Sequence, residues 1–156
     1  MAKVGYSNKT DGEEIARAIG RECKVSPKHC VEICRAIRGM KVEDAKALLS
    51  SVIAMERPIK FRRYNRYTSH KRGYGPARYP VKACKAILRT IESAQANAEA
   101  HKKLDPEAMR ILTAASHLGR KIPGWLPRAH GRATQFDEQT VNIEIVLEAV
   151  EELEEE

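Results

Sequence analysis

Apolar residues recur along the chain with the spacing of three amphipathic helices. The first predicted helix spans residues 27–38, because Ser26 suits an N-cap, proline suits the first helical turn and Gly39 suits a stop. The second covers about 42–55, with two carboxylates in its first turn, and the third covers about 80–98. Each has one apolar face, with residues at intervals of three and four: Cys30, Ile33, Cys34 and Ile37; Val42, Ala45, Leu49, Val52 and Ile53; and Cys84, Ile87, Leu88, Ile91, Ala94 and Ala98.

Two segments nearer the C-terminal end alternate with a period of two. Residues 141–147 place apolar side chains at every odd position, which predicts a half-buried strand. Residues 105–119 fit either of two elements. Asp105-Pro106 resembles a helix start and Gly119 a helix stop, while apolar positions between them also alternate. Local sequence alone favours the helix. The final stretch, 149–156, predicts a solvated acidic tail.

The size and composition fit one domain with a core of its own. The chain has 156 residues, of which 42% are hydrophobic. Its longest unbroken apolar run is four residues, 52–55, which is too short for a membrane-spanning helix. Its first seven residues lack the apolar stretch of a secretory signal. We therefore expect a single cytoplasmic domain, 1–156, with no membrane partner.

The four cysteines favour burial over metal binding or catalysis. Cys30 and Cys34 lie on the first apolar stripe and Cys84 on the third, where cysteine packs as a small hydrophobe. The spacing around His29 lacks the paired ligands of a zinc site, and adjacent helical residues such as His29 and Cys30 point about 100° apart, which is poor for a catalytic dyad. The chain has no nucleophile elbow, phosphate loop or dinucleotide-binding glycine motif. The sequence therefore predicts no enzyme, no metal, no cofactor and no small-molecule substrate.

Basic residues are concentrated in one segment. The net charge is +7, but residues 57–89 hold eleven basic and no acidic side chains, whereas residues 137–156 hold nine acidic and no basic ones. Surfaces normally intersperse both signs because like charges repel. We therefore expect a polyanionic partner to neutralise the basic segment.

The aromatic content of this segment favours nucleic acid, and RNA over DNA. Five of the eight Phe, Tyr and Trp residues lie between 57 and 80, interleaved with Arg and Lys. Arg binds phosphate bidentately, and Arg and Tyr planes stack on unpaired bases. Glycine and proline argue against a long helix, and hence against an amphipathic membrane-surface helix. Residues 57–79 are therefore predicted to form a basic RNA-binding loop.

A second basic stretch, 120–134, precedes the alternating segment near the C-terminus. It contains two prolines and two glycines, and no carboxylate occurs anywhere from 108 to 136. Trp125 and Leu126 add apolar surface in the middle of this stretch. A long basic excursion of this kind is hard to bury within its own domain, so we expect a partner to cover it.

Motifs spread through the chain resemble one ribosomal protein family. Residues 127–134 read Pro-Arg-Ala-His-Gly-Arg-Ala-Thr and are followed by Asn-Ile-Glu-Ile at 142–145, which resembles the signature of universal ribosomal protein twenty-two of the large subunit. Further segments resemble the family in the same order: Val-Ser-Pro-Lys at 25–28, Ile-Arg-Gly-Met-Lys-Val-Glu-Asp-Ala at 37–45, and Arg-Tyr-Pro-Val-Lys-Ala at 78–83 with Asn-Ala-Glu at 97–99. The N-terminal stretch and the basic loop resemble the archaeal and eukaryotic branch.

The resemblance implies an α+β fold, with three helices packed on a small three-stranded antiparallel sheet and a long protruding β-hairpin. The hairpin would span about 108–148 with its tip near 123–130, so residues 109–118 would form a strand and not the helix that local sequence favours. The resemblance also implies a structural constituent of the large subunit that binds its rRNA, contacts neighbouring ribosomal proteins and supports subunit assembly. The hairpin would help line the nascent-polypeptide exit tunnel and touch the nascent peptide.

The resemblance and the charge pattern together assign residues to two contacts. Phosphate neutralisation is expected from eleven side chains: Arg62, Arg63, Arg66, Lys71, Arg72, Arg78 and Lys82 around the loop, and Arg120, Lys121, Arg128 and Arg132 in the hairpin. The hairpin-tip residues expected at the tunnel wall are Trp125, Leu126, Pro127, Arg128, Ala129 and His130. Gly131 would permit close approach to RNA or a positive φ. Pro123 stands where the family usually has a basic residue, which predicts fewer phosphate contacts at the tip.

The alternative reading is a helix-turn-helix regulator that binds nucleic acid. The first two predicted helices are joined by a short turn at 39–41, as in that motif. Its second helix should be basic enough to enter a DNA groove. Here that helix carries only Lys46 in its body, against Glu43 and Asp44, so the charge pattern disfavours this reading.

Overall fold

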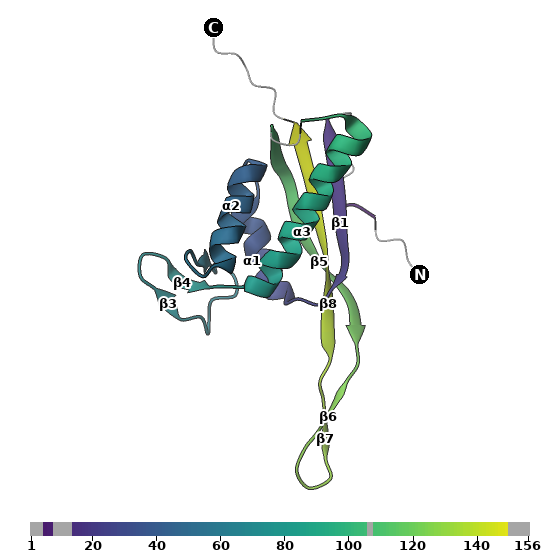
Figure 1. Ribbon diagram of the computed structural model, residues 1–156. Coiled ribbons are helices and arrows are strands. Elements are labelled where there is room, and N and C mark those ends of the chain that lie inside the picture. Colours follow the sequence, from purple (N-terminus) through teal and green to yellow (C-terminus); the bar gives the residue numbers. More distant parts are fainter. Residues whose placement is uncertain (1–4, 8–13, 106–107, 150–156) are drawn as a thin grey trace.

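The computed structural model describes residues 5–7, 14–105 and 108–149 of the chain. Three helices, α1 (Pro27–Ile37), α2 (Val42–Ile53) and α3 (Val81–Asn97), confirm the three predicted ones, and α3 continues into a short π-helix at Ala98–Lys102. The main sheet has three antiparallel strands in the order β1 (Ile15–Cys23), β8 (Glu138–Ala149) and β5 (Met109–Ile122). The helices lie over one face of it (Figure 1). The α+β class and the three-stranded sheet are therefore confirmed.

The core lies between this sheet and the helices. Helix α3 packs on β1 and β8, α1 packs on β5, and α2 packs mainly against α3. The predicted apolar stripes point inward, since Ile33, Leu49 and Ile87 are fully buried. The core role expected of the cysteines holds for Cys30, Cys34 and Cys84, all at most 2% exposed, while Cys23 is only half-buried. Burial raises the pKa of each of these three thiols to about 12.

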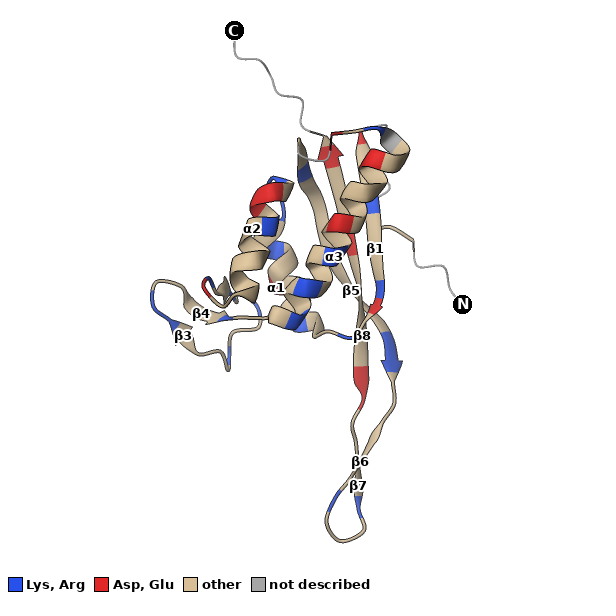
Figure 2. Cartoon of the chain, in the orientation of Figure 1, with Lys and Arg blue, Asp and Glu red and all other residues tan. Residues whose placement is uncertain are grey.

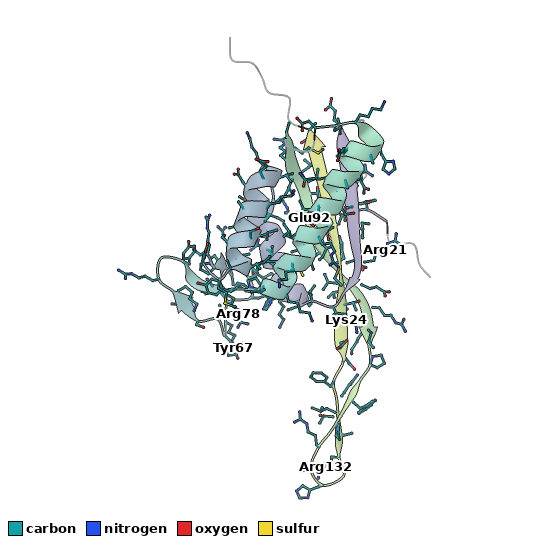
Figure 3. The ribbon with its side chains drawn as sticks, viewed as in Figure 1. Arg21, Lys24, Tyr67, Arg78, Glu92 and Arg132 are labelled. Carbon is teal, nitrogen blue, oxygen red and sulfur yellow. The ribbon has the colours of Figure 1, made fainter. Side chains whose placement is uncertain are left out.

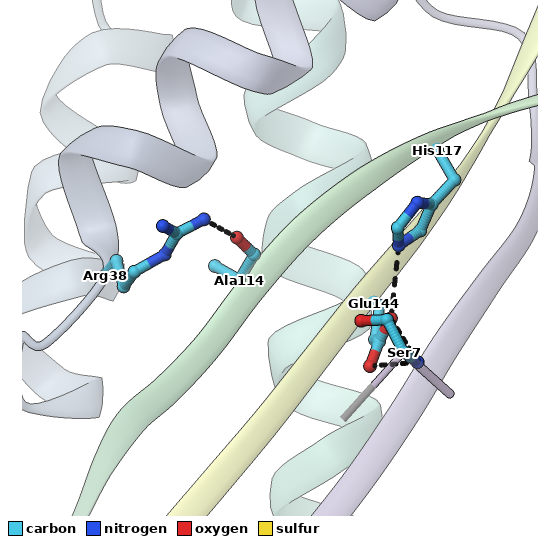
Figure 4. Close-up of polar contacts among 5 residues, drawn as sticks. All are labelled: Ser7, Arg38, Ala114, His117 and Glu144. Carbon is cyan, nitrogen blue, oxygen red and sulfur yellow. Dashed lines mark hydrogen bonds and ion pairs between the residues drawn. The ribbon is translucent and has the colours of Figure 1, made fainter. Parts of the chain in front are cut away.

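Residues 109–118 are a strand, so the helix that local sequence favours there is wrong and the family resemblance is right. In the ladder, Ala114 pairs with Ile145 and Ser116 with Ile143. Pairing with a neighbouring strand overrides the local sequence preference for helix, because the neighbour provides partners for the backbone hydrogen bonds of residues 109–118. The guanidinium of Arg38, just past α1, donates to the carbonyl oxygen of Ala114 at 2.8 Å and ties this strand to the helices (Figure 4).

The strand predicted for residues 141–147 is confirmed as part of β8, but it is buried on both faces and not half-buried as the alternation suggested. Its even positions, Asn142, Glu144 and Val146, are buried like the odd ones. The backbone N–H and hydroxyl of Ser7 donate to the Glu144 carboxylate at 2.7–3.1 Å, and Nε2 of His117 lies 3.2 Å from it (Figure 4). Ser7 and His117 thus cover the Glu144 side chain on β8.

The basic loop contains a small sheet of its own. Strands β2 (Ile59–Lys60), β4 (Gly75–Arg78) and β3 (His70–Lys71) pair in that order, beside the end of α2 (Figure 1). Phe61 and Ala77 are buried and hold this sheet to the body. The basic loop, residues 57–79, is thus a folded flap that contains paired strands, and it is still called the basic loop below.

The hairpin continues β5 and β8 well beyond the body (Figure 1). After a break at 123–124, its arms pair again as β6 (Trp125–Pro127) and β7 (Ala133–Gln135). The turn lies at 128–132, where the N–H of Arg128 donates to the carbonyl oxygen of Arg132 at 2.7 Å. The structure therefore corrects the tip predicted at 123–130: Trp125, Leu126 and Pro127 belong to a paired arm. The predicted acidic tail, 149–156, lies outside the described residues except for Ala149, the last residue of β8.

Candidate nucleic-acid interface

The basic loop and the hairpin leave the body at the same end. Lys and Arg gather over the loop, the first turns of α3 and the hairpin (Figure 2). All eleven side chains predicted to bind RNA are exposed. Lys82 belongs to the first turn of α3. The loop and the first turns of α3 carry their cations at one side of the body, while the hairpin carries its own away from it (Figures 1 and 2).

A buried carboxylate on α1 fixes the start of the loop. Glu32 is 1% exposed, and its carboxylate accepts the backbone N–H groups of Arg62, Arg63 and Tyr64 at 2.7–3.1 Å. Burial by itself would raise the pKa of Glu32, but the three hydrogen bonds and nearby Arg35 outweigh it and lower that pKa. The carboxylate therefore stays ionised and turns the side chains of a basic segment outward. Sequence reasoning missed this residue, because nothing around Glu32 marks its partners.

Several loop cations lie against aromatic rings. The Arg66 guanidinium lies 5.6 Å from the ring centre of Tyr67, and that of Arg78 lies 5.8 Å from Phe61. Arg78 also donates to the carbonyl oxygen of Tyr67 at 2.9 Å. Such contacts restrict long side chains before any partner binds. The loop therefore presents positioned cations next to one exposed ring, Tyr67, and one buried ring, Phe61.

These side chains line a pocket of about 420 Å³ at the junction of the loop and α1. Figure 3 shows Arg78 and Tyr67 below the loop, on the side from which the hairpin extends. From α1 the pocket receives Lys28 and His29, to which sequence reasoning gave no role in RNA binding. The only sequence signal was that Lys28 belongs to the segment 25–28 that resembles the family.

The hairpin cations are not all equally available. Lys121 forms an ion pair with Asp137 on the opposite arm, so its predicted RNA contact competes with a partner inside the chain. The hydrogen bond from Lys121 is the main cause of the lowered pKa of Asp137. Arg128 donates through Nε to the hydroxyl of Thr134 at 3.1 Å, which leaves the rest of its exposed guanidinium free to contact a partner.

The turn of the hairpin uses two residues with positive φ, His130 at 60° and Gly131 at 65°. The expectation of a positive φ at Gly131 is confirmed. Beside the turn, the arms carry exposed apolar side chains, with Trp125 70% exposed and Phe136 63% exposed. Exposed apolar surface of this size on a thin hairpin indicates that a partner covers it.

Comparison with known proteins identifies the family. The family model described as ribosomal protein L22p/L17e matches residues 18–148. The chain belongs to this family. It is 49% identical over 153 residues to large ribosomal subunit protein uL22 of Methanoculleus marisnigri and 48% identical to that of Methanothrix thermoacetophila, covering 96% of this chain and 99% of each relative. The uL22 of Methanopyrus kandleri is 47% identical over 142 residues, covering 88% of this chain and 89% of that protein.

Family membership confirms the resemblance drawn from the motifs, and the relatives agree with its archaeal-type branch. The relatives carry the names of ribosomal proteins and not of enzymes, in agreement with the prediction of no enzyme. In the part of the chain that the structure describes, no cluster of three or more His, Cys, Asp or Glu side chains is placed to hold a metal ion. Across the same residues, every helix is too short or too polar to cross a membrane.

The helix-turn-helix alternative finds no support in the geometry. Val42, Ala45 and Leu49 turn one face of α2 into the core. Its exposed side carries Glu43 and Asp44, which would repel the phosphates of a DNA groove. The densest groups of cations in this L22-family chain lie instead on the loop, the first turns of α3 and the hairpin (Figure 2).

Proposed function

We propose that the chain is a structural constituent of the large ribosomal subunit, located on the cytoplasmic ribosome, where it binds large-subunit rRNA and supports subunit assembly. The observation that carries the proposal is the match to the L22 family over residues 18–148. The two cationic extensions at one end of the body support it, because a folded core with projecting basic segments suits an RNA surface. Neighbouring ribosomal proteins would contact the remaining exposed faces.

Phosphate neutralisation supplies the binding energy in this proposal. The Arg and Lys side chains on the loop displace counterions from the RNA, so affinity falls steeply with salt. The loop is preorganised by Glu32, which lowers the entropy lost when the cations are fixed on RNA. Within the hairpin, Arg120, Arg128 and Arg132 would act in the same way, and Lys121 would do so after releasing Asp137.

Sedimentation of a cell lysate on sucrose gradients at low and high salt tests the proposal. We expect the chain to migrate with the large subunit and to remain there at high salt. Free chain at the top of the gradient would contradict a ribosomal role. With purified chain and large-subunit rRNA, Arg62→Gln with Arg72→Gln should reduce the slope of log K against log salt by about 1.5–2. The matched pair Lys41→Gln, at the N-cap of α2, with Lys46→Gln, within α2, should leave the slope unchanged.

We further propose that the hairpin lines the nascent-peptide exit tunnel. The exposed Trp125 and Phe136, next to a turn that reaches far from the body, support a wall contact with passing peptide. A photoreactive amino acid at His130 should cross-link to a stalled nascent chain, whereas one at Glu43 on α2 should not. Equal labelling from both positions, or none from His130, would contradict the tunnel contact.

A further inference from the structure

The pocket between α1 and the loop has the composition of a nucleotide site. Its volume, about 420 Å³, lies within the range of about 300–1,000 Å³ that holds small ligands. Four of its lining residues are cations: Lys28, Arg63, Arg66 and Arg78. Among the described residues that line it, none is a carboxylate. An anionic group entering the pocket therefore meets only favourable charge.

The same pocket is lined by rings. Phe61 forms its buried floor and packs edge-to-face with His29, with ring centres 5.5 Å apart at 88°. Burial, helped by Arg78, lowers the pKa of His29, so its imidazole is neutral near pH 7. A neutral imidazole offers one donor and one acceptor to the edge of a base.

Tyr67 is the ring available for stacking. It is 83% exposed, which is unusual for a tyrosine on a folded flap, and Arg66 lies 5.6 Å from its ring centre. Its position is set from the backbone side, because Arg78 holds the carbonyl oxygen of Tyr67 at 2.9 Å. A ring held beside cations is suited to stack on a base whose phosphate those cations bind.

From this arrangement we propose that the pocket receives one unpaired, extruded nucleotide of the RNA. Its base stacks on Tyr67, and its phosphate lies among Lys28, Arg66 and Arg78. The inference rests on the proposed rRNA binding and makes it specific: the loop recognises an RNA feature, a bulged nucleotide, in addition to phosphate charge.

The test uses the full chain and three RNA probes of equal length: a perfect duplex, the same duplex with one bulged nucleotide, and that duplex with an abasic bulge. We expect the bulged duplex to bind about 5- to 150-fold more tightly than the other two, the range that stacking of one base spans. Tyr67→Leu should abolish this preference and Tyr67→Phe should keep it. Tyr74→Leu, in the same flap but outside this pocket, is the matched control and should also keep the preference. Circular dichroism would verify the fold of each variant.

Equal affinity of the wild-type chain for all three probes would overturn the nucleotide pocket while leaving phosphate binding, and hence the proposed function, intact. A bulge preference that survives Tyr67→Leu would also overturn it, because another surface would then read the bulge. Failure to bind any probe, together with absence from the large subunit on gradients, would instead refute the proposed function itself.

Discussion

Replacing Glu32 with glutamine tests whether one buried carboxylate holds the basic loop to the body. The single carbonyl oxygen of Gln can replace Oε1, which accepts the N–H groups of Arg63 and Tyr64. Its amide group must then face the N–H of Arg62, which Oε2 now accepts at 3.1 Å. One buried donor is left without a partner, and two hydrogen bonds lose the charge that strengthens them.

The expected loss follows from these three bonds. An unsatisfied buried donor costs about 1–3 kcal/mol, and a hydrogen bond to a neutral acceptor is about half as strong as one to a charged acceptor. Together they predict a loss of about 2–4 kcal/mol in the free energy of unfolding, a large part of the roughly 5–15 kcal/mol of a typical domain. Urea unfolding of the full chain, followed by circular dichroism, measures it. Glu92→Gln, at an exposed position on α3, should change the value by less than about 0.5 kcal/mol.

The pH dependence provides a second readout. Because the pKa of Glu32 is lowered in the folded state, the carboxylate stabilises the fold above its ordinary pKa, and that contribution is lost as the pH falls through the lowered value. The wild type and Glu32→Gln should therefore differ most near neutral pH and converge in acid. Amide exchange at residues 62–64 should accelerate in the variant. Equal unfolding free energies at pH 7 with unchanged exchange would refute the reasoning.

Three further predictions concern the hairpin, the core and the outer face of the sheet. Gly124→Ala should unpair the outer hairpin because a Cβ would strike the carbonyl oxygen of Phe136. Amide exchange at Phe136 should then rise about ten-fold or more, while the melting temperature of the body stays the same. Unchanged exchange at Phe136 would contradict this prediction. A maleimide at pH 8 should label Cys23 long before the three buried cysteines, whose pKa values of about 12 leave almost no thiolate. Mass spectrometry measures the labelling of each cysteine, and equal labelling of all four in the native chain would contradict this prediction. Glu144→Gln should lower the free energy of unfolding in urea by about 1–3 kcal/mol, because the Glu144 carboxylate accepts the N–H and hydroxyl of Ser7. The control Glu148→Gln, which breaks an exposed ion pair, should cost less than about 1 kcal/mol. Equal losses in the two variants would contradict the stabilising role given to Glu144.

The helices were predictable because their signals are local. Ser26, Pro27 and Gly39 mark the ends of α1, and each apolar stripe repeats within one element. Strand β5 was not predictable from its own residues, because its partner β8 lies some thirty positions later in the sequence. Strand β1, whose sequence mixes Ala, Gly and Arg, was not predicted, because its pairing with β8 and its packing under α3 depend on distant residues.

The candidate site also has a part that the sequence predicted and a part that depends on residues far apart in the chain. The basic and aromatic composition of residues 57–79 predicted the surface, because charge is additive and visible in sequence. The anchor at Glu32 was invisible, since its partners are backbone N–H groups some thirty residues away. The pocket was equally invisible, because it forms only when α1 brings Lys28 and His29 against the loop.

The central strand of the main sheet is also the last described element to be synthesised. Strand β8 pairs on both sides, with β1 from the start of the described chain and with β5. While a ribosome is still making residues 138–149, β1 and β5 have no neighbour to bridge them, and the helices have no complete sheet to cover. Folding during synthesis therefore has to wait until β8 has been made, and until then the apolar faces of the helices need shielding.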